Sequence, residues 1–171
     1  MVYVDQTLAK TCRLDIGCGS IPTGDVNLDL LVPGDERRQF DPRNIKNFIL
    51  ADCQHLPFPD NTFLEVYSSH FLEHVRDPDA CLAEMLRVAQ VRVCAIVPCH
   101  VFTIFYNLVH PPNYFWDKKH HRQRFWLNPF HTRNVRLRYV RLKDAVLHGR
   151  PAFGPGLKIP IPRDTVTVIE K

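Results

Sequence analysis

Short apolar runs alternate with polar, turn-rich segments along most of this 171-residue chain. Runs of this length that are bounded by turn signals predict β-strands. Seven strands are expected, at residues 11–17, 25–32, 47–53, 61–69, 91–99, 135–142 and 164–171. Strands separated by helices and loops predict an α/β sheet that is largely parallel. The segments 135–142 and 165–170 can pair as an antiparallel edge of that sheet.

Helical patterns are fewer than strand patterns. Residues 77–90 carry apolar side chains at helical spacing, and Asp77 or Asp79 can cap the first turn. Residues 100–110 are apolar enough to form a second helix, which the two prolines that follow would end.

The connection after the first strand is unusually short. Only six residues, 20–25, separate Gly19 from the second strand at Val26, whereas a crossover helix needs about a dozen residues. The later segment 33–46 is too polar, and too rich in Pro and Gly, for a clear helix. The sequence therefore predicts a trimmed α/β sheet whose first helix is short or absent.

Composition places the chain among ordinary globular proteins. It is 45% hydrophobic and 23% charged, which argues against disorder. No stretch approaches the roughly 18 apolar residues of a membrane span, and the first residues lack the apolar core of a signal peptide, so we expect a cytoplasmic protein that has no membrane partner. The six cysteines form no CxxC pair and are expected to be buried thiols rather than zinc ligands or disulfides.

Charge is concentrated in one segment. Residues 113–150 contain 10 Lys and Arg against 2 Asp and Glu, with aromatic residues interleaved. This mixture suits a polyanion or a stacked base, and it equally suits a solvated basic face over an aromatic core. The candidate substrate contacts in the segment are His120, His121, Arg122 and Arg124. The histidines have poor spacing for a metal, and no metal site is predicted.

The segment LDIGCGS, residues 14–20, ends the first strand in a glycine turn. Glycine lets the backbone approach a ligand closely, and ligands of α/β sheets bind beyond the carboxyl ends of the strands. The dinucleotide fingerprint G-x-G-x-x-G is incomplete here, because its third glycine is missing. Asp15 would also repel a phosphate and would suit an ammonium group instead. A nicotinamide oxidoreductase is therefore disfavoured.

Two further carboxylates follow at strand ends. Asp29 ends the second strand, where it can accept hydrogen bonds from both hydroxyls of a ribose. Asp52 ends the third strand, where it can accept one from an exocyclic amine such as that of adenine. Together with Asp15 they describe a ligand that has an ammonium group, a ribose and an adenine but no phosphate. S-adenosylmethionine matches that description.

The ordered motifs LDIGCGS, VNLDL and ADCQHLPFPDNTFLEVYSSHFLEHVRDP resemble the class I S-adenosylmethionine-dependent methyltransferases, and within them the type 11 group. The resemblance covers about residues 12–98. It implies a Rossmann-like, seven-stranded sheet with an antiparallel C-terminal strand. It also implies a single domain, 1–171, with a cofactor-binding half at 1–98 and a substrate-facing half at 99–171.

The resemblance assigns roles to single residues. Asp15, Gly17, Cys18 and Gly19 would hold the methionine end of the cofactor. The other cofactor contacts that it implies are Asp29 at the ribose, Leu30 beside the adenine, Asp52 and Cys53 at the adenine, and Ser69 near the methyl group.

Methyl transfer requires the acceptor atom to be aligned with the methyl carbon, and a general base helps where the acceptor carries a proton. His70 and His100 follow the fourth and fifth strands and are the candidate bases, although such histidines can also simply pack at the sheet edge. The residues after the fourth strand, SSHF, differ from the N/D/S-PP-Y/F motif of enzymes that methylate base amines. We expect an oxygen or nitrogen acceptor, on RNA or on an anionic or aromatic small molecule such as a phosphorylated one. The alternative is a non-catalytic cofactor-binding subunit that activates a partner, and a homodimer is a further possibility.

Overall fold

The computed structural model describes residues 12–30, 40–100, 135–141, 146–147, 150–151 and 160–171. Its strands are β1 (Arg13–Ile16), β2 (Val26–Asp29), β3 (Phe48–Leu50), β4 (Phe63–Ser69), β5 (Ala89–Pro98), β6 (Val135–Arg141), β7 (Val146–Leu147), β8 (Arg150–Pro151) and β9 (Pro160–Glu170). Its helices are the short 3-10 turn η1 (Pro42–Asn44) and the α-helix α2 (Pro78–Val88). The predicted helix at 100–110 lies almost wholly outside the described residues.

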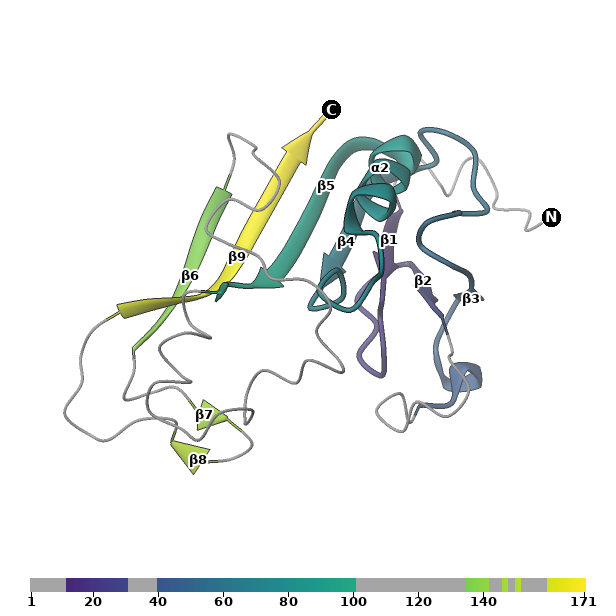
Figure 1. The fold of residues 1–171 in the computed structure, drawn as a ribbon. Helices are drawn as coiled ribbons and strands as arrows, with labels where there is room; N and C mark the ends of the chain where they lie inside the picture. The colour runs from purple at the N-terminus through teal and green to yellow at the C-terminus, as the bar shows by residue number, and fades with distance from the viewer. Residues whose placement is uncertain (1–11, 31–39, 101–134, 142–145, 148–149, 152–159) are drawn as a thin grey trace.

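The main sheet has the strand order β3-β2-β1-β4-β5-β9-β6, and β7 pairs with β8 separately (Figure 1). The strands from β3 to β5 are parallel to one another. β9 runs antiparallel to both of its neighbours, β5 and β6. The predicted sheet, largely parallel with an antiparallel C-terminal strand, is confirmed.

β9 begins at Pro160, earlier than the sequence predicts. The two prolines at 160 and 162 interrupt the strand pattern, since proline cannot donate a ladder hydrogen bond. Pairing with β5 starts only at Asp164, so the first residues of β9 pair with β6 alone. Prolines are tolerated where one side of a strand has no partner, and this accounts for the extra length.

Residues 17–25 join β1 to β2 without a helix, as predicted. Backbone hydrogen bonds hold this connection instead: the amides of Gly17 and Cys18 both donate to the carbonyl of Leu28, at 2.8 and 3.2 Å. At the other end of the connection the amide of Asp25 donates to the carbonyl of Arg13, at 2.9 Å. The loop therefore folds back along β2, and a parallel pair forms with a very short crossover.

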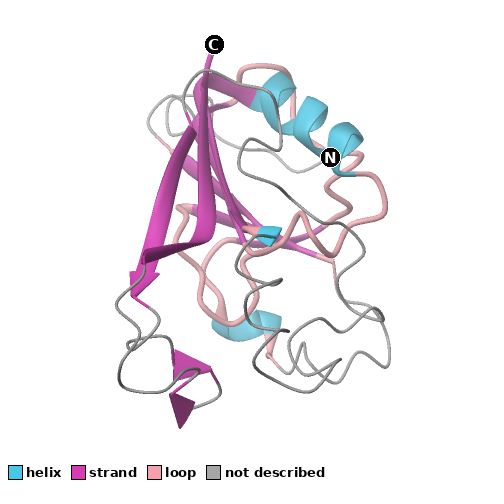
Figure 2. Ribbon diagram, turned by 60° about the vertical axis from the view of Figure 1, so that its left-hand side comes forward, coloured by secondary structure: helices cyan, strands magenta, loops and turns pink. Residues whose placement is uncertain are grey.

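Helix α2 covers one face of the sheet (Figures 1 and 2). Asp77 caps it by accepting a hydrogen bond from the amide of Ala80 at 3.0 Å, and Pro78 occupies the first turn. Its buried residues Cys81, Met85 and Val88 join a core cluster with the inward-facing residues of the strands. β5 starts at Ala89, directly after the helix, so the helix ends two residues earlier than predicted.

The opposite face of β1, β4 and β5 is polar. The Arg13 guanidinium lies 3.8 Å from the centre of the Tyr67 ring and pairs with Glu65, which also pairs with Arg92. Alternation along these strands explains the contrast, because successive side chains point to opposite faces. Asp15 is paired with Tyr67 in the β1–β4 register and so lies on this polar face. Within the described part of the chain, no helix has the length and apolar character to span a bilayer.

Arg87 fastens the loop before β4 to helix α2. Its guanidinium donates to the carbonyls of Phe58 and Leu56, at 2.8 and 3.0 Å, and to the carboxylates of Glu84 and Asp60. These charge-assisted bonds satisfy loop carbonyls that have no strand partner. Bonding to the guanidinium also holds the pKa of Glu84 below its usual value.

We expect Arg87→Ala to lower the free energy of unfolding by about 2 kcal/mol, because it leaves the carbonyls of Leu56 and Phe58 without their donor. The lowered pKa of Glu84 adds stability above the ordinary carboxyl range, and this stability is lost as the pH falls through the lowered value. The difference between the wild type and the variant should therefore shrink in acid. Urea titrations at pH 7 and near pH 3 measure both effects.

Arg92→Ala is the matched control, since Arg92 pairs with Glu65 on the exposed face. Surface ion pairs contribute about 0–1 kcal/mol, so this variant should stay within that range. Equal losses for Arg87→Ala and Arg92→Ala would contradict the role given to Arg87.

Candidate functional site

A pocket of about 380 Å³ lies where β1 and β4 end. Its lining comes from the loop after β1 and from the last residues of β4: Asp15, Gly17, Cys18, Gly19, Ser20, Ile21, Thr23, Tyr67 and Ser69. Five of these residues were predicted to hold the cofactor. The pocket therefore brings the glycine loop together with the carboxyl end of β4, as expected for a ligand site of a parallel sheet.

Asp15 is buried beneath the loop that it helps to hold. Its Oδ2 accepts hydrogen bonds from the Thr23 amide, at 2.8 Å, and from the Thr23 hydroxyl, at 2.7 Å. Its Oδ1 accepts none from the described residues, and this oxygen is the one that a ligand can use. Burial raises the pKa of Asp15, and the two bonds from Thr23 oppose that rise.

The two glycines of the loop serve different purposes. Gly17 has a φ of +73°, and a Cβ on it would lie 2.2 Å from ring atoms of Phe71. Gly19 has a φ of +53°, but a Cβ there would meet no atom within 4 Å. Gly17 is therefore required for packing against the turn after β4, whereas Gly19 leaves open space at the pocket.

Asp29 holds the glycine loop and does not line the pocket, and its predicted contact with a ribose stays a prediction. Its Oδ2 accepts a hydrogen bond from the amide of Gly19 at 2.9 Å, and its Oδ1 accepts one from the amide of Leu30 at 2.7 Å. The carboxylate thus ties the glycine loop to the end of β2. A carboxylate offers about four acceptor sites, so these amides and a pair of ribose hydroxyls can share it. Leu30 is 39% exposed beside it.

Asp52 and Cys53 follow β3 and do not line the pocket. The Oδ1 of Asp52 accepts a hydrogen bond from the amide of Gln54 at 2.9 Å, and Cys53 is buried in the core. Their predicted contacts with adenine stay predictions. None of the six cysteines, all of which lie in the described ranges, forms a disulfide.

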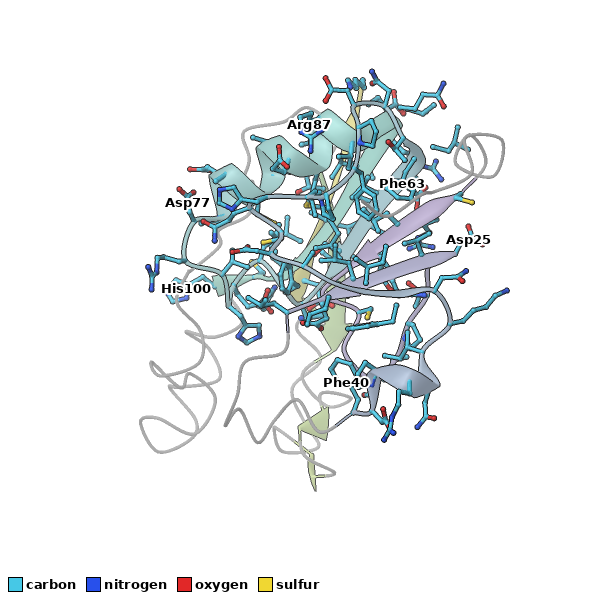
Figure 3. The ribbon with its side chains drawn as sticks, turned by 90° about the vertical axis from the view of Figure 1, so that its right-hand side faces the viewer. Asp25, Phe40, Phe63, Asp77, Arg87 and His100 are labelled. Carbon is cyan, nitrogen blue, oxygen red and sulfur yellow. The ribbon has the colours of Figure 1, made fainter. Side chains whose placement is uncertain are left out.

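His70 stands directly after Ser69, where β4 leaves the sheet. Its φ is +52°, and its amide donates to the carbonyl of Ile96 in β5 at 2.8 Å. Glu73 and Asp164 lie near its ring nitrogens, and its side chain is 46% exposed. His100 follows the end of β5. In Figure 3 it is labelled lower in the view than Phe63, the residue with which β4 begins. The predicted contacts His120, His121, Arg122 and Arg124 lie outside the described residues.

Sequence reasoning missed part of the pocket. Tyr67 stands two residues before Ser69 in β4, and strand alternation places both on one face, so this signal was available. Thr23 and Ile21 carry no such signal, because their positions depend on how the shortened loop folds over Asp15. Ile21 is 78% exposed and forms an apolar rim of the pocket.

The residues that are present fit the predicted cofactor. An aspartate oxygen without a described partner can receive an ammonium group. The open side of Gly19 leaves room for a ligand against the backbone. Asp29, at the end of the neighbouring strand, carries a carboxylate of the kind that can accept hydrogen bonds from a diol. The donor and acceptor set therefore matches a ligand that has an amino-acid end and a ribose.

Comparison with known proteins gives the following matches. Residues 14–92 match the sequence family described as "Methyltransferase domain". An uncharacterized methyltransferase of Schizosaccharomyces pombe is 31% identical over 137 residues, which cover 67% of this chain and 49% of that protein. The ubiquinone/menaquinone biosynthesis C-methyltransferase of Haemophilus ducreyi is 37% identical over 81 residues, which cover 47% of this chain and 31% of that protein. The chain spans about a third of the length of such quinone-pathway relatives.

Solved structures agree on the fold. A methyltransferase of Thermotoga maritima, described as a possible histamine N-methyltransferase, superposes with a TM-score of 0.64 at 12% identity, covering 93% of this chain and 81% of that one. A methyltransferase of Archaeoglobus fulgidus superposes with a TM-score of 0.61 at 15% identity, covering 96% and 88%. Both are described as S-adenosylmethionine-dependent.

We expect Gly17→Ala to cost about 2–4 kcal/mol of unfolding free energy, because it combines a strained φ with a clash against Phe71. Gly19→Ala should cost about 1 kcal/mol, from the backbone alone. Chemical denaturation of the two single variants measures the difference. In the double variant Gly17→Ala/Phe71→Ala the loss should be smaller than the sum of the single losses, and strict additivity would refute the proposed contact.

Proposed function

We propose that this chain, whose residues 14–92 match a methyltransferase domain, is a class I S-adenosylmethionine-dependent methyltransferase that transfers a methyl group to an oxygen or nitrogen of a second substrate. The observation that carries the proposal is the pocket between the glycine loop and the end of β4. The pocket is lined both by Asp15, whose Oδ2 alone accepts bonds from the described residues, and by Gly19, on whose open side a ligand has room.

The proposal gives tasks to Asp15 and the glycine loop, which line the pocket, and to Asp29, which does not line it. Asp15 pairs with the ammonium group of the cofactor, and the loop from Gly17 to Ser20 covers its methionine end. Asp29 receives the ribose hydroxyls while it keeps the loop attached through the amide of Gly19. Because these groups are already placed by Thr23 and by backbone bonds, little rearrangement is needed on binding.

The chemistry requires alignment and removal of one proton. When bound, S-adenosylmethionine supplies an electrophilic methyl carbon, which bonds to the acceptor atom as the carbon–sulfur bond breaks and its electron pair stays on sulfur. The protein aligns the acceptor through the residues around the pocket. His70, half-exposed and next to Ser69, takes the proton that a hydroxyl or ammonium acceptor loses.

The proposed class of acceptor is argued from the sequence of the second half of the chain. The basic, aromatic segment 113–150 favours an anionic or aromatic acceptor, and RNA and phosphorylated small molecules both have this chemistry. The relatives whose names specify quinone biosynthesis are C-methyltransferases, which makes a ring carbon of a quinol the second candidate. The family match ends at residue 92, and so it gives no support for either acceptor in the half that follows.

A third possibility is a subunit that binds the cofactor without catalysing transfer and activates a partner. The short connection after β1 favours it, because it leaves this side of the cofactor without a helix. Such a subunit would bind S-adenosylmethionine and leave every acceptor unmethylated when alone. A homodimer would be a separate way of completing the site.

The test is a transfer assay with methyl-labelled S-adenosylmethionine on RNA, phosphorylated and aromatic small molecules, and a quinol precursor. We expect label in an oxygen- or nitrogen-bound methyl group, identified by mass spectrometry of the product. His70→Asn should lower kcat by about 100-fold with little change in the cofactor KM, because general-base catalysis is worth about 10²–10⁴.

His55→Asn is the matched control, since His55 is an exposed histidine on the loop before β4. It should retain the wild-type kcat. Label on a ring carbon would replace the proposed acceptor by the quinol. Cofactor binding without transfer to any acceptor would favour the activating subunit.

A further inference from the structure

The turn after β4 holds its histidine in a strained backbone. A non-glycine residue at φ +52° costs of order 1–3 kcal/mol and persists where its surroundings fix it. The bond from the His70 amide to the Ile96 carbonyl fixes it from β5. On the other side, Phe71 packs against Gly17. The backbone of the turn at His70 is therefore held from two sides, by β5 and by the loop after β1.

Two buried carboxylates lie against the two ring nitrogens. Glu73 Oε1 is 3.6 Å from Nδ1 of His70, and Asp164 Oδ1 is 3.7 Å from Nε2. Both carboxylate side chains are 1% exposed, whereas the imidazole is 46% exposed. Asp164 comes from β9, which reaches the site by pairing with β5 opposite Pro98. A ring that solvent can reach is thus bordered by carboxylates that solvent cannot.

Glu73 can accept a hydrogen bond that none of the described residues donates. Its Oε2 is buried and accepts no hydrogen bond from them. His74 Nε2 is 3.9 Å from its Oε1, and Arg138 stands opposite Asp164 in the β6–β9 register. Burying carboxylates is costly unless a positive partner compensates. For Glu73, the nearby described groups that can become positive are the imidazoles of His70 and His74.

We infer that Glu73 and Asp164 are positioning residues that hold His70 as the proton acceptor of methyl transfer, an inference that rests on the proposed function. Their negative charges favour the protonated ring, which is the form that His70 reaches when it takes the proton. The acceptor keeps the electron pair of its broken O–H or N–H bond for the new bond to carbon. The proton is taken by the ring nitrogen that carries none, Nδ1 or Nε2, and the imidazolium then releases it to water.

The first measurement is an NMR titration of the His70 ring nitrogens in wild type, Glu73→Gln and Asp164→Asn, with His70→Asn used for assignment. Both isosteric variants should lower the titration midpoint by about one pH unit or more, since each removes a charge facing the ring. Asp79→Asn, on the exposed first turn of α2, should leave the midpoint unchanged. An unchanged midpoint in both variants would overturn the inference.

The second measurement compares pH profiles of kcat/KM with the acceptor found in the transfer assay. If His70 is the base, the acidic limb should move to lower pH in step with the NMR midpoint. A midpoint that moves while the limb stays fixed would mean that the carboxylates only balance charge. In Glu73→Gln and Asp164→Asn, the affinity for S-adenosylhomocysteine should stay within about twofold of the wild-type value.

The two proposals can fail separately. A wild type that binds S-adenosylhomocysteine but methylates nothing contradicts the proposed function, whatever the NMR midpoints are. A wild type that transfers methyl groups with a profile insensitive to both variants contradicts the positioning role alone. Refolding problems are recognised by circular dichroism, and Asp164→Glu, which keeps the charge, should then restore the wild-type midpoint.

Discussion

The contact between Gly17 and Phe71 is the constraint on which the rest of the site depends. The ring occupies the space that a Cβ at position 17 would need, so the loop after β1 and the turn after β4 meet directly. This contact leaves no room for a Cβ at position 17, where φ is also positive, and the turn that delivers Phe71 has another positive φ at His70. Because both segments are fixed to each other, Ser69 lines the same pocket as the glycine loop, and His70 follows Ser69 in the chain.

Two carboxylates, rather than a crossover helix, hold the short connection between β1 and β2 in place. Asp15 accepts two hydrogen bonds from Thr23, which hold the far part of the loop to β1. Asp29 accepts one from the amide of Gly19, which attaches the loop to the end of β2. Both are buried, a position that carboxylates occupy only when hydrogen bonds compensate. The same groups are the acceptors that the proposed cofactor needs. In the proposed function the same two carboxylates would serve both the loop and the cofactor, so a substitution at either position should affect both.

Much of the fold could be predicted from the sequence, because the decisive signals are local. Alternating and continuous apolar runs gave the strands, Asp77 gave the start of α2, and six residues between Gly19 and Val26 were too few for a helix. The acidic residues predicted at strand ends include Asp15, which lines the pocket, so they pointed to the edge of the sheet where the pocket lies.

The remaining features depend on contacts distant in sequence. Nothing local indicates that Phe71 lies on Gly17, that Asp164 approaches His70, or that Arg87 binds loop carbonyls 29 and 31 residues away. The start of β9 was missed for a different reason: its prolines conceal a strand that pairs on one side. The sequence pointed to the edge of the sheet at which the pocket lies, but it could not say which of the two glycines packs against Phe71 and which has open space beside it.

Calorimetric titration of S-adenosylhomocysteine into wild type and Asp15→Asn tests the central claim most directly, with Asp25→Asn as the control. Asparagine can still accept the bonds from Thr23 but lacks the charge that an ammonium group requires. The account predicts that wild type binds, that Asp15→Asn binds at least about tenfold more weakly, since a charge-assisted hydrogen bond is worth about 1.5–3 kcal/mol, and that the control binds like wild type. Equal affinity in wild type and Asp15→Asn would contradict the account, as would a wild type that does not bind.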